Sequence, residues 1–244
     1  MPTSETSMSD QPILHVEGLT AGYGGAPVIE GVAIDARLGQ LTVMVGPNGA
    51  GKSTLMKAIA GVVRPSGGRV VLNGSDVTGR APERLVVLGM SYVPQLANVF
   101  PSLTIAENLE MGGYVRKAGT KERAAELLEM FPDLRAARRR PARTLSGGQR
   151  TMLAIARGLM LDPKTLLLDE PTAGLSPKIE GAVWDRILAI RASGVAVVVV
   201  EQNTRRALRH ADRAYVLVNG RNRLEGTGQE LSDTERLAAI YLGE

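Results

Sequence analysis

The segment from Gly46 to Ser53 constrains the fold of this 244-residue chain more than any other part of the sequence. It reads Gly-Pro-Asn-Gly-Ala-Gly-Lys-Ser and fits the pattern G-x-x-x-x-G-K-[ST] in full. An apolar run, Leu41–Val45, precedes it, and a helical pattern over residues 52–60 follows, with Gly61 placed to end that helix. Glycines let a backbone wrap closely around phosphate oxygens, and a helix N-terminus points N–H groups at them. The sequence therefore predicts a phosphate-binding loop between a buried strand and a helix.

Short apolar runs alternate with helical patterns through the second half of the chain. Apolar strands joined by helices are typical of an α/β protein with a largely parallel sheet covered on both faces. Near the N-terminus, two strands separated by Gly24-Gly25 predict an antiparallel hairpin beside this sheet. The expected strands are Ile13–Leu19, Val28–Ile34, Leu41–Val45, Arg69–Leu72, Met90–Val93, Thr165–Leu168, Val195–Val200 and Ala214–Val218, and the later helices are Pro177–Arg191, Thr204–His210 and Glu235–Leu242.

The middle of the chain has helical patterns between the two groups of strands. The pattern is helical from Thr104 to about Arg139, and again from the region of Leu145 to Leu161. We therefore expect a polar, disordered tail over residues 1–11 and one domain over residues 12–244, with a helical subdomain at about 98–160. The expected buried positions of the first helical stretch are Leu109, Leu127, Leu128 and Met130.

Composition excludes several classes of protein. There are no cysteines and two distant histidines, His15 and His210, so disulfides and thiolate or histidine metal sites are not expected. The longest purely apolar run, Val195–Val200, is far shorter than the ~20 residues that span a bilayer. Residues 1–11 lack the basic and apolar regions of a secretory signal, and we expect a cytoplasmic location. The net charge of +4 suits phosphate ligands, nucleic acid or an anionic membrane surface equally.

Two carboxylates, Asp169 and Glu170, follow the apolar run Leu166-Leu-Leu. In proteins with a phosphate loop, an acidic residue at such a strand end supports Mg²⁺, which fits Asp169. Glu170 is then placed to polarise an attacking water as a general base. Lys52 would reach the β- and γ-phosphates, and Ser53 would hold the metal. These residues predict a site for ATP and Mg²⁺.

A second glycine motif, Leu145-Ser-Gly-Gly-Gln149, ends 20 residues before the first of these carboxylates. A serine hydroxyl and glycine amides that open a helix form a further anion site. The pentapeptide resembles the signature motif of ABC ATPases. Tyr23, Gln95 and Ala173-Gly-Leu-Ser176 stand where that family has its adenine-stacking aromatic residue, its Q-loop glutamine and its D-loop. The resemblance extends over roughly residues 12–243 and implies a P-loop NTPase cassette with a parallel core, an antiparallel β subdomain and a helical insert.

The resemblance also implies a mechanism. Two cassettes close head to tail on two ATP molecules, and each nucleotide lies between one chain's phosphate loop and the other chain's signature motif. Gln95 would link nucleotide state to the helical insert, which contacts the membrane subunits. The implied catalytic residues are Lys52, Glu170 and Gln202, the metal-binding residues are Ser53, Gln95 and Asp169, and the nucleotide contacts are Tyr23, Gly46, Pro47, Asn48, Gly49, Ala50, Gly51, Lys52, Ser53, Thr54, Gln95, Ser146, Gly147, Gly148 and Gln149.

Two positions depart from the common ABC pattern. Gln202 stands where most cassettes have a switch histidine, and Ser176 replaces the D-loop aspartate. A glutamine can donate to the γ-phosphate but cannot carry positive charge, so a slower, regulated ATPase is one interpretation. Subfamily variation is the other, and we favour it. The segments Val200-Glu-Gln-Asn203, 92–109 and Tyr241-Leu-Gly243 resemble the smaller ATP-binding subunit of branched-chain amino-acid importers.

This second resemblance implies an importer subunit at the cytoplasmic face of the inner membrane. Its partners would be a second cassette, membrane permease chains and, indirectly, a substrate-binding protein. Gln95 stands where that subfamily usually has glutamate, and urea and amide importers share much of the pattern, so the cargo is left open.

Two other functions remain as alternatives. A soluble ABC ATPase could act on nucleic acid or macromolecular assemblies, but two Phe and one Trp leave few aromatic platforms, and we expect no nucleic-acid partner. A catalytically silent regulatory cassette is disfavoured by the intact Lys52, Asp169 and Glu170. The basic cluster available to the first alternative is Arg135, Arg138, Arg139, Arg140 and Arg143.

Overall fold

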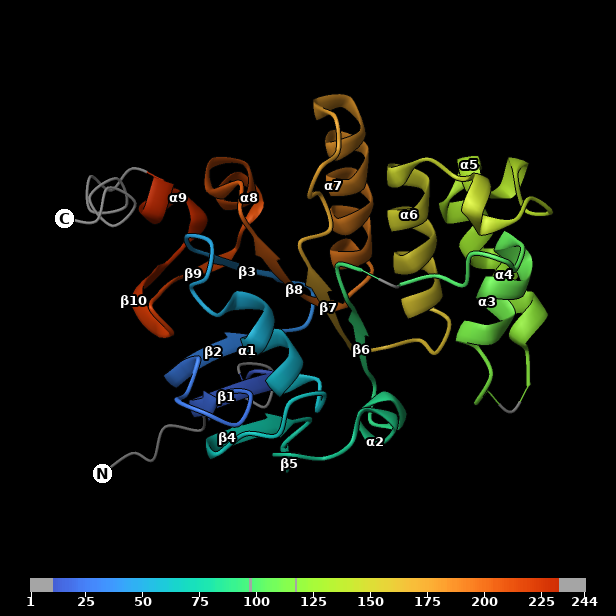
Figure 1. Ribbon diagram of the computed structural model, residues 1–244. Helices are drawn as coiled ribbons and strands as arrows, with labels where there is room; N and C mark the ends of the chain where they lie inside the picture. The colour runs from blue at the N-terminus through green and yellow to red at the C-terminus, as the bar shows by residue number, and fades with distance from the viewer. Residues whose placement is uncertain (1–10, 97, 117, 233–244) are drawn as a thin grey trace, which may run out of the picture.

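A computed structural model describes residues 11–96, 98–116 and 118–232 (Figure 1). Within these residues, the main sheet has six strands in the order β10-β9-β3-β8-β7-β6. Five of them run parallel, and β10 pairs antiparallel with β9 at one edge. The largely parallel core predicted from the apolar runs is therefore confirmed. The strands are β3 (Leu41–Val45), β6 (Met90–Val93), β7 (Thr165–Asp169), β8 (Ala196–Glu201), β9 (Arg213–Val218) and β10 (Arg221–Gly226).

The main sheet is covered on both faces. In β3, Val43 packs in the cluster formed with helices α6, α7 and α8, whereas the next residue, Met44, packs with α1 and the second sheet. Successive strand residues point to opposite faces, so a strand buried on both sides reads as one continuous apolar run. The helices are α1 (Lys52–Ile59), α6 (Gly147–Gly158), α7 (Pro177–Ala192) and α8 (Thr204–His210).

The second sheet is antiparallel, with strand order β2-β1-β4-β5. It confirms the N-terminal hairpin, although each of its two strands extends about two residues beyond the predicted end. Figure 1 shows this sheet and α1 on the same side of the main sheet. The strands are β1 (Leu14–Ala21), β2 (Ile29–Ala36), β4 (Gly67–Leu72) and β5 (Ser75–Asp76).

The helical stretch predicted from Thr104 to Arg139 is three helices rather than one. Proline at the first position begins the third, where its missing N–H needs no partner. They lie beside α6, away from the second sheet (Figure 1). The prediction of burial was wrong for Met130, which is half-buried at the end of its helix, and right for Leu109, Leu127 and Leu128. The helices are α3 (Ile105–Gly112), α4 (Thr120–Met130) and α5 (Pro132–Ala136).

Some elements were not predicted. These are β5, β10, helix α2 (Pro82–Val87) and helix α9 (Gly228–Ser232). The predicted helix Glu235–Leu242 and residues 1–10 of the predicted tail lie outside the described residues. Within the described ranges, no helix is both long and apolar enough to cross a bilayer.

Candidate active site

The glycine-rich loop, residues 46–51, connects β3 to α1 at the carboxyl edge of the parallel strands. Gly51 has φ 99°, and a Cβ there would lie 2.6 Å from Ile29 Cγ2, so a larger residue fits neither the backbone nor the space. The Gly220 amide donates to the Ala50 carbonyl at 3.0 Å and ties the loop to the β9–β10 turn. These features hold the loop in a curled shape.

Lys52 begins α1 and lies inside the curled loop, only 4% exposed. Its ammonium donates to the carbonyls of Gly46 at 2.9 Å and Pro47 at 3.1 Å. Burial lowers the pKa of Lys52, although the carboxylates of Glu170 and Asp169 favour its charged form. A cation is thus held where phosphate oxygens would enter, and it can exchange loop carbonyls for them.

Asp169 ends β7 and is 3% exposed. The Ser53 hydroxyl donates to its Oδ1 at 3.0 Å, and the Tyr92 hydroxyl donates to its Oδ2 at 3.1 Å. Burial raises the pKa of Asp169, and these two hydrogen bonds partly oppose that change. The pairing of a hydroxyl with a carboxylate gives two oxygen ligands from different elements at one point. Such hard oxygen donors suit Mg²⁺.

Glu170 follows directly and has a backbone φ of 48°, a region that residues with side chains rarely adopt. Its amide donates to the Val200 carbonyl at 3.0 Å. Its Oε2 accepts hydrogen bonds from Gln95 Nε2 at 2.9 Å and from Gln202 Nε2 at 2.6 Å. The structure therefore brings two predicted site residues, Gln95 and Gln202, from beyond the ends of the neighbouring strands β6 and β8, onto the carboxylate of a third, Glu170.

One cavity of about 310 Å³ collects most of the predicted residues. Tyr23 is not among the lining residues. It is 62% exposed, its hydroxyl is 3.5 Å from Thr54 Oγ1, and Lys57 Nζ lies over its ring, 6.0 Å from the centroid. The residues that line the cavity are Val28, Asn48, Gly49, Ala50, Gly51, Lys52, Ser53, Thr54, Gln95, Glu170 and Gln202.

The signature segment is not part of this cavity. Ser146 caps α6, accepting from the Gln149 amide, while Gln149 Oε1 accepts from the Ser146 amide. Both line a separate cavity between α5, α6 and α7. A Cβ at Gly148 would lie 2.2 Å from Ile179 Cγ2, so this glycine permits close packing of α6 on α7. Within one chain, the two glycine motifs therefore belong to different sites.

Two residues of the site were missed by the sequence analysis, the half-buried Tyr92 and the buried Glu201. Tyr92 was noted only as part of a subfamily pattern, yet its hydroxyl bonds Asp169. Glu201 is 2% exposed and bonds both Thr172 and Gln202. A charged residue that directly ends a run of buried valines was the available signal for Glu201. Nothing in the sequence places the hydroxyl of Tyr92.

Fold and site together define a P-loop ATPase. A family model described as "ABC transporter" matches residues 29–173. The chain therefore belongs to the ABC transporter family, whose cassettes bind nucleotide and hydrolyse ATP. The predicted fold class and enzyme class are confirmed.

Curated relatives match along nearly the whole chain. The probable branched-chain amino acid transport ATP-binding protein LivF of Archaeoglobus fulgidus is 43% identical, over 95% of this chain and 99% of its own. The high-affinity branched-chain amino acid transport ATP-binding protein BraG of Pseudomonas aeruginosa is 38% identical, over 95% of this chain and 100% of its own. The lipopolysaccharide export system ATP-binding protein LptB of Haemophilus influenzae is 34% identical, over 95% of this chain and 98% of its own. The resemblance to ATP-binding subunits of branched-chain amino acid transporters is thus confirmed, and relatives named for other cargoes exist.

Solved structures share the fold. An ATP-binding cassette of an ABC transporter in its ADP conformation superposes with a TM-score of 0.88, at 29% identity, over 96% of this chain and 100% of that one. A second cassette, solved as a dimer in a post-hydrolysis state with ADP and Pi, has a TM-score of 0.78 at 24% identity, over 88% of this chain and 98% of that one.

Proposed function

We propose that this ABC ATPase powers a membrane importer for branched-chain amino acids or related amino acids and amides. The likeness to LivF and BraG over almost the full length of both carries this proposal. The Gln202 departure supports it, because a glutamine at this position accompanies the sequence pattern of that subfamily.

The residues of the cavity would divide the work of hydrolysis. The loop amides and Lys52 would bind the β- and γ-phosphates, and the exposed ring of Tyr23 would stack on adenine. Ser53, Asp169 and Gln95 would hold Mg²⁺, which would supply positive charge to the phosphates. Glu170 polarises the attacking water, and Gln202 donates to Glu170 and to the γ-phosphate.

Hydrolysis by this chain would need a second cassette. The signature residues Ser146, Gly147, Gly148 and Gln149 form no part of the chain's own phosphate cavity. Serine and glycine groups at the start of α6 suit an anion, and the γ-phosphate held by another cassette would fit them. The complete assembly would add permease chains and a substrate-binding protein, with this subunit at the cytoplasmic face of the inner membrane and its helical subdomain, about residues 98–160, toward the permease.

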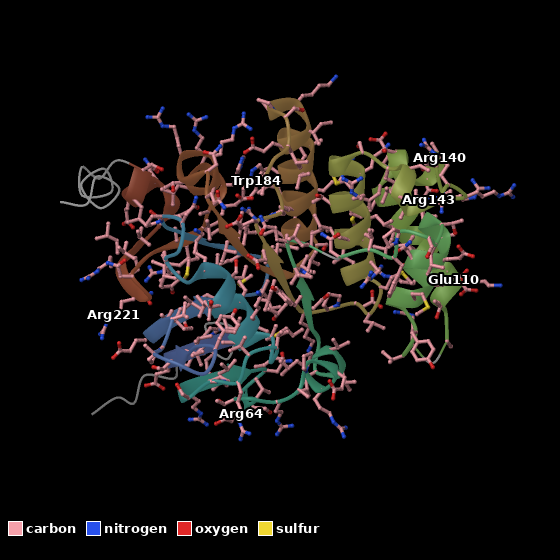
Figure 2. The ribbon with its side chains drawn as sticks, viewed as in Figure 1. Arg64, Glu110, Arg140, Arg143, Trp184 and Arg221 are labelled. Carbon is pink, nitrogen blue, oxygen red and sulfur yellow. The ribbon has the colours of Figure 1, made fainter. Side chains whose placement is uncertain are left out.

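The alternative of a nucleic-acid ATPase finds little support in the basic cluster. Arg135 pairs with Glu129, and Arg140 donates to the carbonyl of Thr144. Figure 2 shows Arg140 and Arg143 at the outer edge of the helical region. Arginines that bond a neighbouring helix and a nearby carbonyl of their own chain are typical of a solvated face.

Uptake by cells tests the proposal. The chain and its genomic neighbours are expressed in a strain without its own branched-chain importer, and entry of labelled leucine, urea and acetamide is measured. We expect uptake of leucine with the natural chain and none with Glu170→Gln. Co-purification from solubilised membranes identifies the partners. Uptake of none of the three, or recovery of permeases from an export system, would contradict the importer.

A further inference from the structure

The buried carboxylate of Glu201 connects the two segments that carry Glu170 and Gln202. Its Oε1 accepts from the amide of Thr172 at 3.0 Å and from the Thr172 hydroxyl at 2.7 Å. Its Oε2 accepts from the amide of Gln202 at 3.2 Å. One side chain thus satisfies three donors, two of them on the loop after β7 and one just beyond β8.

Further hydrogen bonds join the loop after β7 to the end of β8. Glu170 donates its amide to the Val200 carbonyl, and its carboxylate accepts from the side chain of Gln202. Two residues further on, Thr172 is fixed to Glu201, whose backbone continues into Gln202. The loop after β7 and the end of β8 are therefore tied at three points, and neither can shift without the other.

Glu170 needs this restraint because its φ of 48° is unfavourable for a residue with a side chain. Such a conformation persists only where surrounding structure holds it. A loop that relaxed by a small rotation would carry the Glu170 carboxylate away from its two amide donors. Since a misplacement of about 1 Å at a catalytic group can cost about a hundredfold in rate, the restraint has chemical consequences.

Packing alone does not account for a charge at this position. The rest of β8, Ala196 to Val200, is apolar and fully buried. Burial raises the pKa of Glu201, which means that the fold disfavours its ionised form. An apolar side chain would extend β8 without that cost but would leave the amides of Thr172 and Gln202 without this acceptor.

We propose that Glu201 is a positioning residue for ATP hydrolysis. Through its bonds to Thr172 and to the Gln202 amide, it fixes the positions of Glu170 and Gln202 relative to each other. The inference rests on the proposed role of Glu170 as general base. It predicts an effect on turnover with little effect on nucleotide binding, since Glu201 does not line the phosphate cavity.

The test measures kcat, the Kd for a fluorescent ATP analogue with Mg²⁺, and the thermal midpoint of purified variants. Glu201→Gln keeps the shape but replaces one acceptor oxygen with a donor, so one of the three bonds is lost. We expect kcat to fall about tenfold or more while Kd changes by less than about twofold. Thr172→Val, which removes only the hydroxyl bond, should also lower kcat, but by less than Glu201→Gln.

Glu180→Gln is the matched control, because Glu180 is also buried, 7% exposed, but pairs with Arg206 away from the cavity. It should lower the thermal midpoint and leave kcat within about twofold.

A Glu201→Gln variant with natural kcat, or one in which kcat and the affinity for the nucleotide fall together, would overturn the inference. Glu170→Gln separates the two proposals. Full turnover in that variant would overturn the general-base role of Glu170. If Glu170→Gln loses turnover while Glu201→Gln keeps its natural kcat, only the positioning role of Glu201 is overturned. If Glu201→Gln does not fold, an unchanged kcat in Thr172→Val overturns the inference.

Discussion

The two glycine motifs of this chain are held in different ways. Around the phosphate loop, side chains from the ends of β6, β7 and β8 bond one another, with Gln95 and Gln202 on Glu170 and Ser53 on Asp169. The signature segment is a local structure, in which the Ser146 and Gln149 side chains bond each other's backbone amides. The first region is assembled by the tertiary fold, whereas the second is a capped helix start. One chain can therefore preorganise the phosphate site, and under the proposed function the second motif would meet a ligand held by another chain.

Replacing the proposed general base, Glu170, should have the largest effect. Glu170→Gln keeps the size of the side chain but removes the carboxylate that polarises water, so ATP turnover should fall about a hundredfold or more. ATP binding should persist, because the loop and Lys52 are unchanged, and an ATP-bound dimer should accumulate. Phosphate release and gel filtration measure the two effects. Unchanged steady-state turnover would show that Glu170 is not the base.

The signature segment should affect turnover without affecting binding to a single chain. Ser146→Ala removes a hydroxyl that caps α6 and faces the proposed partner, and we expect about a tenfold loss of turnover. Thr104→Ala is a matched control, because Thr104 has the same capping box at the start of α3. Each variant should lose about 1 kcal/mol of stability. Equal turnover in both variants would mean that Ser146 acts only as a cap.

The carboxylate of Asp169, the proposed metal ligand, should destabilise the folded chain at neutral pH. Because burial raises the pKa of Asp169, the folded chain binds more protons than the unfolded chain between the ordinary and raised values, and stability falls as pH rises through that window. At neutral pH, without nucleotide or Mg²⁺, Asp169→Asn should therefore raise the thermal midpoint by a few degrees while hydrolysis is lost. The gain should disappear in acid. A lower midpoint for Asp169→Asn at neutral pH would contradict the account.

The smallest effect is expected at the switch position. Gln202→His replaces one hydrogen-bond donor with another, so affinity for ATP should change by less than about twofold. Equilibrium binding of a labelled nucleotide measures it. A large loss of affinity would argue against the assignment of Gln202 to this position.

Sequence patterns predicted the phosphate-loop region well because its signals are local. The strand Leu41–Val45 and the helix Thr204–His210 have the predicted bounds, since an apolar run or a cap determines each end. Gln95 and Gln202 were placed by family position, and the structure adds that both bond one oxygen of Glu170. The division of the chain into a cassette and a helical subdomain stays a prediction.

The missed features depend on contacts between distant residues. Tyr92 and Asp169 are far apart in sequence but neighbours across β6 and β7, and no local pattern announces that pairing. β10 has alternating exposed and half-buried residues with little apolar character, so its composition does not predict a strand. Its pairing with β9 makes it one. Glu201 could have been found from its position, but its partners could not.

Cross-linking between chains tests the central claim, that the phosphate loop of one cassette and the signature segment of another form one site. The chain has no cysteines, so Glu170→Gln chains that carry Asn48→Cys can be mixed with Glu170→Gln chains that carry Ser146→Cys. Disulfide formation is then measured with and without ATP and Mg²⁺. The account predicts a cross-linked dimer that requires ATP. Binding of ATP with no cross-link, or a cross-link that forms equally without ATP, would contradict it.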